Sequence, residues 1–131
     1  MGKKVIAAGH ICLDITPVFS KAGKKTMSSI LQPGKLIQMK GVDLHAGGSV
    51  ANTGLAMKIL GADVTLMGKI GKDAFGDMIH NILKEYKAEK GMLVMEGEST
   101  SYSVILAVPG IDRIFLHNPG ANDTFQADDV P

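Results

Sequence analysis

Three short apolar runs recur along the chain, and each has the pattern of a buried strand. They lie at residues 5–8, 64–67 and 92–95, and none of them contains a charged side chain. Continuous apolar runs of this length are typical of parallel strands that are covered on both faces. The pattern therefore predicts three strands of a parallel sheet.

Two segments with helical character separate these runs. Residues 73–87 present apolar and polar side chains on opposite faces, with Asp73 at the N-cap and lysines near the C-terminal end. Residues 49–60 carry one charge, Lys58, and are small or apolar on nearly every face, which predicts a helix buried on more than one side. Strand, helix, strand, helix and strand in this order predict an α/β protein with an open parallel sheet.

The first strand and the first helix are separated by about forty residues, so this long insertion is expected to hold structure of its own. Residues 11–16 alternate apolar and polar side chains, which predicts a half-buried strand with one polar face. Residues 36–44 are a second candidate strand, and a further pair at 102–108 and 113–118 flanks a Pro-Gly turn. Together they predict a small antiparallel sheet that projects from the parallel one. The lysine-rich stretch 21–25 is expected to be a solvated loop.

Composition narrows the classes of function. The chain has 131 residues and a formal net charge of +1, from 14 Lys and Arg against 13 Asp and Glu. A balance this close to neutral gives no global field for nucleic acid or an anionic membrane, so neither is an expected partner. Gly9 and His10 interrupt the first apolar run, and no membrane span or secretion signal is expected. The single cysteine, Cys12, excludes an intrachain disulfide and indicates a reducing, cytoplasmic compartment.

Candidate binding residues gather at the carboxyl ends of the predicted strands, where open α/β sheets bind ligands. Gly47 and Gly48 precede the first helix and allow a ligand to approach its free N–H groups. Asn52 falls in the first turn of that helix, and Asp14 lies on the polar face of the inserted strand. A carboxylate and an amide that meet over a glycine pair suit a neutral, polyhydroxylated ligand, because hydroxyl groups both donate and accept hydrogen bonds.

These residues also carry a family resemblance. The segment 47–54, continued through Gly61, Gly68, Gly71, Asp73 and Gly76, resembles the first signature of the ribokinase-like (PfkB) carbohydrate kinases, and Gly9 with Asp14 resembles the family's N-terminal motif. The resemblance implies a ribokinase-like doubly wound sheet with an inserted antiparallel β lid. It implies sugar-hydroxyl contacts for Asp14, Gly47, Gly48 and Asn52. It also implies phosphoryl transfer from ATP, with Mg, to a sugar hydroxyl in the intact enzyme.

The family's second signature, Asp-Thr-x-Gly-Ala-Gly-Asp, has no match in this chain. In the family that segment carries the catalytic base, the anion hole and most of the ATP site. The resemblance therefore implies the N-terminal, substrate-binding portion of a longer kinase, with lid segments at about 11–45 and 96–118 and no C-terminal nucleotide-binding portion. No catalytic residue and no bound cofactor are expected in this chain alone. A homo-oligomer through the lid or an exposed sheet edge is expected, and Ser103, Ile105 and Met95 are candidate lid contacts to the sugar.

Several alternatives remain open from the residues. A non-catalytic sugar-binding or dimerisation module would keep the sugar site and lid without the chemistry. A serine hydrolase would use Ser49, an aspartate and His117, although Ala51 stands where the nucleophile turn needs glycine. A dinucleotide-binding domain fails on the spacing of its glycines. Asp73 is interpreted as a helix cap, Cys12 as a small half-buried residue, and the four histidines lack metal-ligand spacing, so no metal is expected.

Overall fold

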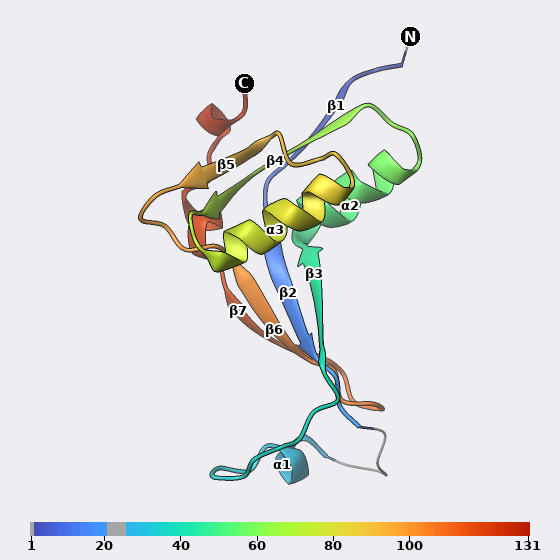
Figure 1. Cartoon of the computed structure of the whole chain (residues 1–131), viewed down its shortest axis with the longest axis vertical. Helices are drawn as coiled ribbons and strands as arrows, with labels where there is room; N and C mark the ends of the chain where they lie inside the picture. Colours follow the sequence, from blue (N-terminus) through green and yellow to red (C-terminus); the bar gives the residue numbers. More distant parts are fainter. Residues whose placement is uncertain (1, 21–25) are drawn as a thin grey trace.

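The computed structural model describes residues 2–20 and 26–131, and the predicted loop at 21–25 lies outside them. Its upper layer is a parallel sheet of β1 (Val5–Ala8), β4 (Val64–Gly71) and β5 (Met92–Met95), in the order β1-β4-β5 (Figure 1). The three predicted strands are thus confirmed. β4 continues beyond residue 67 because Gly68–Gly71 pair with β5 instead of forming a loop. A side chain at Gly71 would strike the backbone of the segment that follows β5.

Helices α2 (Gly48–Ile59) and α3 (Ala74–Glu85) connect these strands and lie side by side on one face of the sheet (Figure 1). α3 has the predicted amphipathic pattern, with Ile79 and Leu83 fully buried. The prediction that α2 is buried on more than one side is wrong. The helix packs on one side only, where Val50, Ala51 and Gly54 are buried and Leu55 and Met57 contact the core, and Leu60 at its end is 86% exposed. No element within the described part of the chain covers the outer face of this helix.

A second sheet projects away from the first and contains four strands in the order β3-β2-β6-β7 (Figure 1). Their bounds are β2 (Cys12–Pro17), β3 (Val42–Gly47), β6 (Tyr102–Leu106) and β7 (Ile114–Asn118). The predicted antiparallel sheet is in fact mixed, since β2 and β6 pair in parallel. The reason is topological. β2 continues the direction of β1 and β6 continues that of β5, so two parallel strands leave the upper sheet, and β3 and β7 return beside them.

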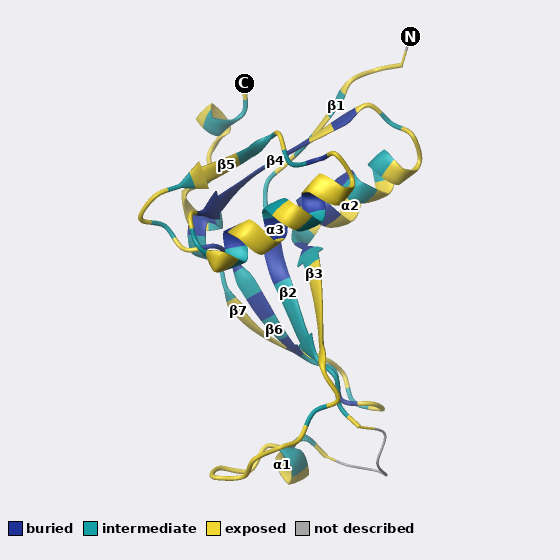
Figure 2. Cartoon of the chain, in the orientation of Figure 1, coloured by how far each residue is buried: buried dark blue, intermediate teal, exposed yellow. Residues whose placement is uncertain are grey.

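The strand predicted at 36–44 is displaced toward the helix. β3 begins at Val42 because Pro17, its partner there, is the last residue of β2. Residues 36–39 lie outside both sheets, while Lys40 and Gly41 exchange backbone hydrogen bonds with Val18, just beyond the end of β2. The insertion also holds the short helix α1 (Met27–Ile30). The edge strands β3 and β7 are largely exposed, whereas β2 and β6 between them are better buried near the upper layer (Figure 2).

The second sheet has one apolar and one polar face. Leu13 belongs to the hydrophobic core, Ile15 packs against that core, and Tyr102 meets Phe75 of α3 edge to face at a ring distance of 5.4 Å. Because side chains alternate along a strand, Asp14 and its cross-strand neighbours point to the opposite face, away from α3. The predicted alternation at 11–16 is therefore confirmed.

The junction between the two sheets is closed by the C-terminal segment. Ile11 lies between β1 and β2, and its N–H donates to Asn122 Oδ1 at 3.1 Å while Asn122 Nδ2 donates to its carbonyl at 2.9 Å. Asn122 belongs to the 3-10 helix η1 (Gly120–Thr124), and a second such helix, η2 (Ala127–Asp129), follows. The buried Lys69 of β4 donates a hydrogen bond from Nζ to the carbonyl oxygen of Thr124 and forms an ion pair with Asp129, with Nζ 3.2 Å from Oδ2. Among residues 2–20 and 26–131, no helix has the length and apolarity needed to cross a membrane.

Candidate functional site

Asp14, Gly47 and Gly48 meet where β3 enters α2. Asp14 pairs in register with His45, two residues before Gly47. A Cβ atom on Gly47 would overlap the Asp14 carboxylate, so a larger residue there would displace that carboxylate. Gly48 has φ of +84°, and a Cβ atom on it would lie 2.6 Å from both Nδ1 and the carbonyl oxygen of His10. The two glycines therefore let a carboxylate and an imidazole approach the start of a helix.

Asn52 occupies the first part of α2, one helical turn beyond Gly48, and its side chain is exposed. Residues four apart lie on the same helix face, so Asn52 flanks the glycine pair. No hydrogen bond within the described segments joins Asn52 to Asp14. The contact of these four residues with a sugar remains a prediction.

A row of polar side chains crosses the second sheet at the level of Asp14. His45 of β3, Asp14 of β2, Ser103 of β6 and His117 of β7 are paired in register, so all four lie on the polar face. Ser103 Oγ and His117 Nδ1 are 2.8 Å apart. The histidines of this row were not among the predicted site residues. Their signal in the sequence was the strand alternation, but the register that aligns them depends on pairing between segments up to about ninety residues apart, which a single chain does not reveal.

Cys12 also belongs to the polar face, two residues before Asp14. Its thiol donates to Asp14 Oδ1 at 3.3 Å. Burial, together with the Asp14 charge, raises the pKa of Cys12 to about 12. The thiol therefore stays protonated at neutral pH and acts as a donor that helps to orient the carboxylate. Cys12 is fully buried, at 3% exposed, and not half-buried as predicted.

The candidate lid contacts differ in position. Ser103 and Ile105 lie in β6 and are both buried. Met95 does not belong to the second sheet: it ends β5, where it pairs with Gly71. Its assignment to the lid was wrong because the chain leaves the upper sheet only after β5.

Asp73 caps α3 as predicted, accepting a hydrogen bond from Gly76 N at 2.8 Å. It also accepts bonds from the backbone and hydroxyl of Thr100, at 2.8 and 2.6 Å. Burial alone would raise the pKa of Asp73, but the bonds from Thr100 and Gly76 outweigh it and lower the pKa. The carboxylate thus ties α3 to the connection between β5 and β6, a structural role.

The serine hydrolase alternative finds little support in this arrangement, since His117 bonds Ser103 and not Ser49. Over the ranges that the structure describes, no three His, Cys, Asp or Glu side chains come close enough together to hold an ion.

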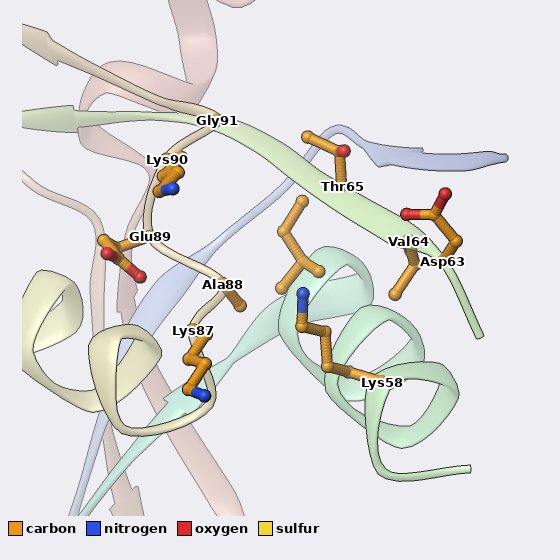
Figure 3. Close-up of a pocket in the computed structure, with 10 residues that line it drawn as sticks. Lys58, Asp63, Val64, Thr65, Lys87, Ala88, Glu89, Lys90 and Gly91 are labelled. Atoms are coloured by element: carbon orange, nitrogen blue, oxygen red, sulfur yellow. The ribbon is translucent and has the colours of Figure 1, made fainter. Parts of the chain in front are cut away.

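A cavity of about 460 Å³ lies at the other end of the parallel sheet, where β4 and β5 begin (Figure 3). Its lining includes Lys58, Lys87 and Lys90, with Asp63 and Glu89. None of the predicted site residues contributes to it. Because open α/β sheets bind ligands at the carboxyl ends of their strands, the position of this cavity favours the glycine pair over the cavity as the functional site.

Comparison with known proteins identifies the family to which this chain belongs. The model described as pfkB family carbohydrate kinase matches residues 3–130. Fructokinase-1 from Zea mays is 31% identical over 129 residues, which are 96% of this chain and 36% of the relative. The chain thus spans little more than a third of the length of such curated relatives.

Solved structures agree on the fold. A fructokinase from Xylella fastidiosa has a TM-score of 0.72 at 22% identity, over 98% of this chain and 37% of that one. A ribokinase from Giardia lamblia has a TM-score of 0.78 at 21% identity, over 100% of this chain and 40% of that one. The fold is therefore ribokinase-like, as the resemblance implied. Since the family model covers nearly the whole chain, this protein belongs to the pfkB family of carbohydrate kinases.

Proposed function

We propose that this chain is the sugar-binding and lid part of an ATP-dependent sugar kinase and acts in the cytoplasm. The observation that carries the proposal is the Asp14 carboxylate, held against Gly47 beside the start of α2. A fixed carboxylate accepts hydrogen bonds from two sugar hydroxyls, and the helix N-terminus offers N–H groups to sugar oxygens. Asn52 supplies a further donor and acceptor on the same side of the helix.

In this proposal the second sheet is the lid. Its polar face carries Asp14 and Ser103 over the sugar, and closure excludes water while the phosphoryl group is transferred. The groups around Asp14 are imidazoles, a thiol and a hydroxyl, none of them a permanent cation, so they do not fit a triphosphate. ATP and Mg are therefore assigned to the part of the kinase that corresponds to the remaining two thirds of its relatives.

The experiment joins this chain to the C-terminal two thirds of a homologous fructokinase and measures ADP formation with D-fructose and D-ribose. We expect sugar-dependent ADP formation by the chimera and none by the 131-residue chain alone, because positioning of ATP and its metal supplies most of the catalysis. Sugar-dependent turnover by the chain alone, in a sample of verified mass, would contradict this division. An inactive chimera in which the chain still binds sugar would favour the non-catalytic binding module.

The apolar face of the second sheet supports a homo-oligomer. Beyond the reach of α3 it exposes Leu44 on β3 and Leu116 on β7, the latter 54% exposed, with Val42 and Ile114 beside them. A contiguous apolar sheet face of this kind marks an association surface. We expect the chain to dimerise at micromolar concentration and the double variant Leu44→Glu/Leu116→Glu to be monomeric, as measured by light scattering. A wild-type chain that stays monomeric at high concentration would count against the surface.

A further inference from the structure

The imidazole rings of His10 and His117 lie close together where the second sheet joins the parallel sheet, on the face that carries Asp14. His10 lies between β1 and β2, and His117 lies in β7, more than a hundred residues later. Their ring centroids are 5.3 Å apart, and the planes are tilted by 43°. The two residues come together at this junction because the chain leaves the upper sheet at His10 and β7 returns toward it. Neither ring is needed for the hydrophobic core.

Each ring contacts the protein on one side and is open to another molecule on the other side. His117 Nδ1 is engaged by Ser103 Oγ, which leaves Nε2 for another partner. The His10 carbonyl accepts from Val50 N at 3.1 Å, and the ring lies over Gly48, which fixes it at the start of α2. His10 is only partly buried and His117 is exposed, so a molecule seated on the glycine pair can reach both.

We propose that His10 and His117 form an imidazole subsite beside Asp14 that binds uncharged sugar hydroxyls. This inference rests on the proposed function and adds a substrate class, an uncharged sugar in place of a sugar phosphate or sugar acid. A neutral imidazole offers one acceptor and one donor, which matches a hydroxyl group.

The surroundings make the subsite sensitive to acid. Titratable groups face it from β2, as Asp14 and Cys12, and from β3, as His45, while β6 contributes only the Ser103 hydroxyl. Burial and the neighbouring His117 lower the pKa of His10, and Asp14 opposes them. His10 is thus uncharged at pH 8. On acidification a protonated ring loses its acceptor and attracts the Asp14 carboxylate, which then is less available to the sugar.

The test is NMR of the 131-residue chain with D-fructose as the probe, following the imidazole signals and the amides of Gly47 and Gly48. We expect fructose to shift the signals of both His10 and His117 at pH 8, and its affinity to fall between pH 8 and pH 5.5 by up to about tenfold, the largest change that one linked proton allows on an imidazole whose pKa is lowered. His117→Gln should raise the pKa of His10 and so shift this pH dependence to higher pH, whereas His10→Gln should flatten it. His80→Gln is the matched control and should keep the pH dependence, because His80 lies on α3, away from Asp14 and the ring pair.

Three outcomes would overturn the inference. If fructose shifts the glycine amides but neither imidazole, the subsite is absent while the proposed function stands. If affinity for fructose is unchanged on acidification, or fructose 6-phosphate binds more tightly as the pH falls, the pair binds anions or nothing. If neither fructose nor ribose shifts any of these signals, the proposed function and the subsite fail together.

Discussion

Replacing Asn122 by leucine should lower the free energy of unfolding by about 2–5 kcal/mol, the largest loss that we expect from a single polar side chain of this protein. Ile11 is 0% exposed and lies outside both sheets, so neither its N–H nor its carbonyl has a strand partner. The amide of Asn122 satisfies both groups, at 3.1 and 2.9 Å. Leucine fills a similar volume and satisfies neither.

Urea denaturation of the 131-residue chain measures this effect. Asn81→Leu is a matched control, since Asn81 is exposed on α3 and the same change there should shift stability by no more than about 0.5 kcal/mol. Equal losses in the two variants would show that the junction tolerates an unpaired Ile11. A second expectation concerns the site: because Ile11 separates His10 from Cys12, loosening it should broaden the backbone signals of β2 before the chain unfolds.

The parts of this fold that were predictable are those set by local pattern. The three core strands and α3 follow from runs and periods within fifteen residues, and Asp73 caps α3 as its position indicated. The glycine pair and Asp14 were predictable as a set because a helix start and an alternating strand each leave a local signal. Whether they bind sugar remains to be tested.

The parts that were not predictable depend on pairing between distant segments. The parallel contact of β2 with β6 joins residues about ninety apart, and it alone turns the second sheet from antiparallel to mixed. The same pairing aligns Asp14 with Ser103 and, one strand further, with His117. Asn122 looked like an ordinary loop residue, since its role depends on a partner, Ile11, at the other end of the chain. The wrong prediction for the burial of α2 has the same cause, because the composition of a helix does not show which other segments cover its outer face.

Removal of the Asp14 side chain is expected to weaken sugar binding tenfold to a hundredfold with little effect on folding. A charged acceptor of sugar hydroxyls in a partly desolvated site contributes on the order of 1.5–3 kcal/mol, which is that change in affinity. Stability should stay within about 0.5 kcal/mol, because Leu13 and Ile15 hold the strand from its other face. Calorimetry of the fructokinase chimera with its sugar measures the first quantity, and thermal unfolding without sugar measures the second. An unchanged affinity in Asp14→Ala would mean that the carboxylate is merely solvated.

A double-mutant cycle with Gly47 makes the geometry itself testable. The three atoms nearest to a Cβ on Gly47 all belong to the Asp14 carboxylate, and the backbone there, with φ of −121° and ψ of −169°, suits alanine. Gly47→Ala should therefore displace the carboxylate and lose about as much sugar affinity as Asp14→Ala. Once Asp14 is alanine the obstacle is gone, so adding Gly47→Ala should cost little more, and the two losses should not add. Additive losses would show that Gly47 serves the sugar directly, through its close backbone approach, and independently of Asp14.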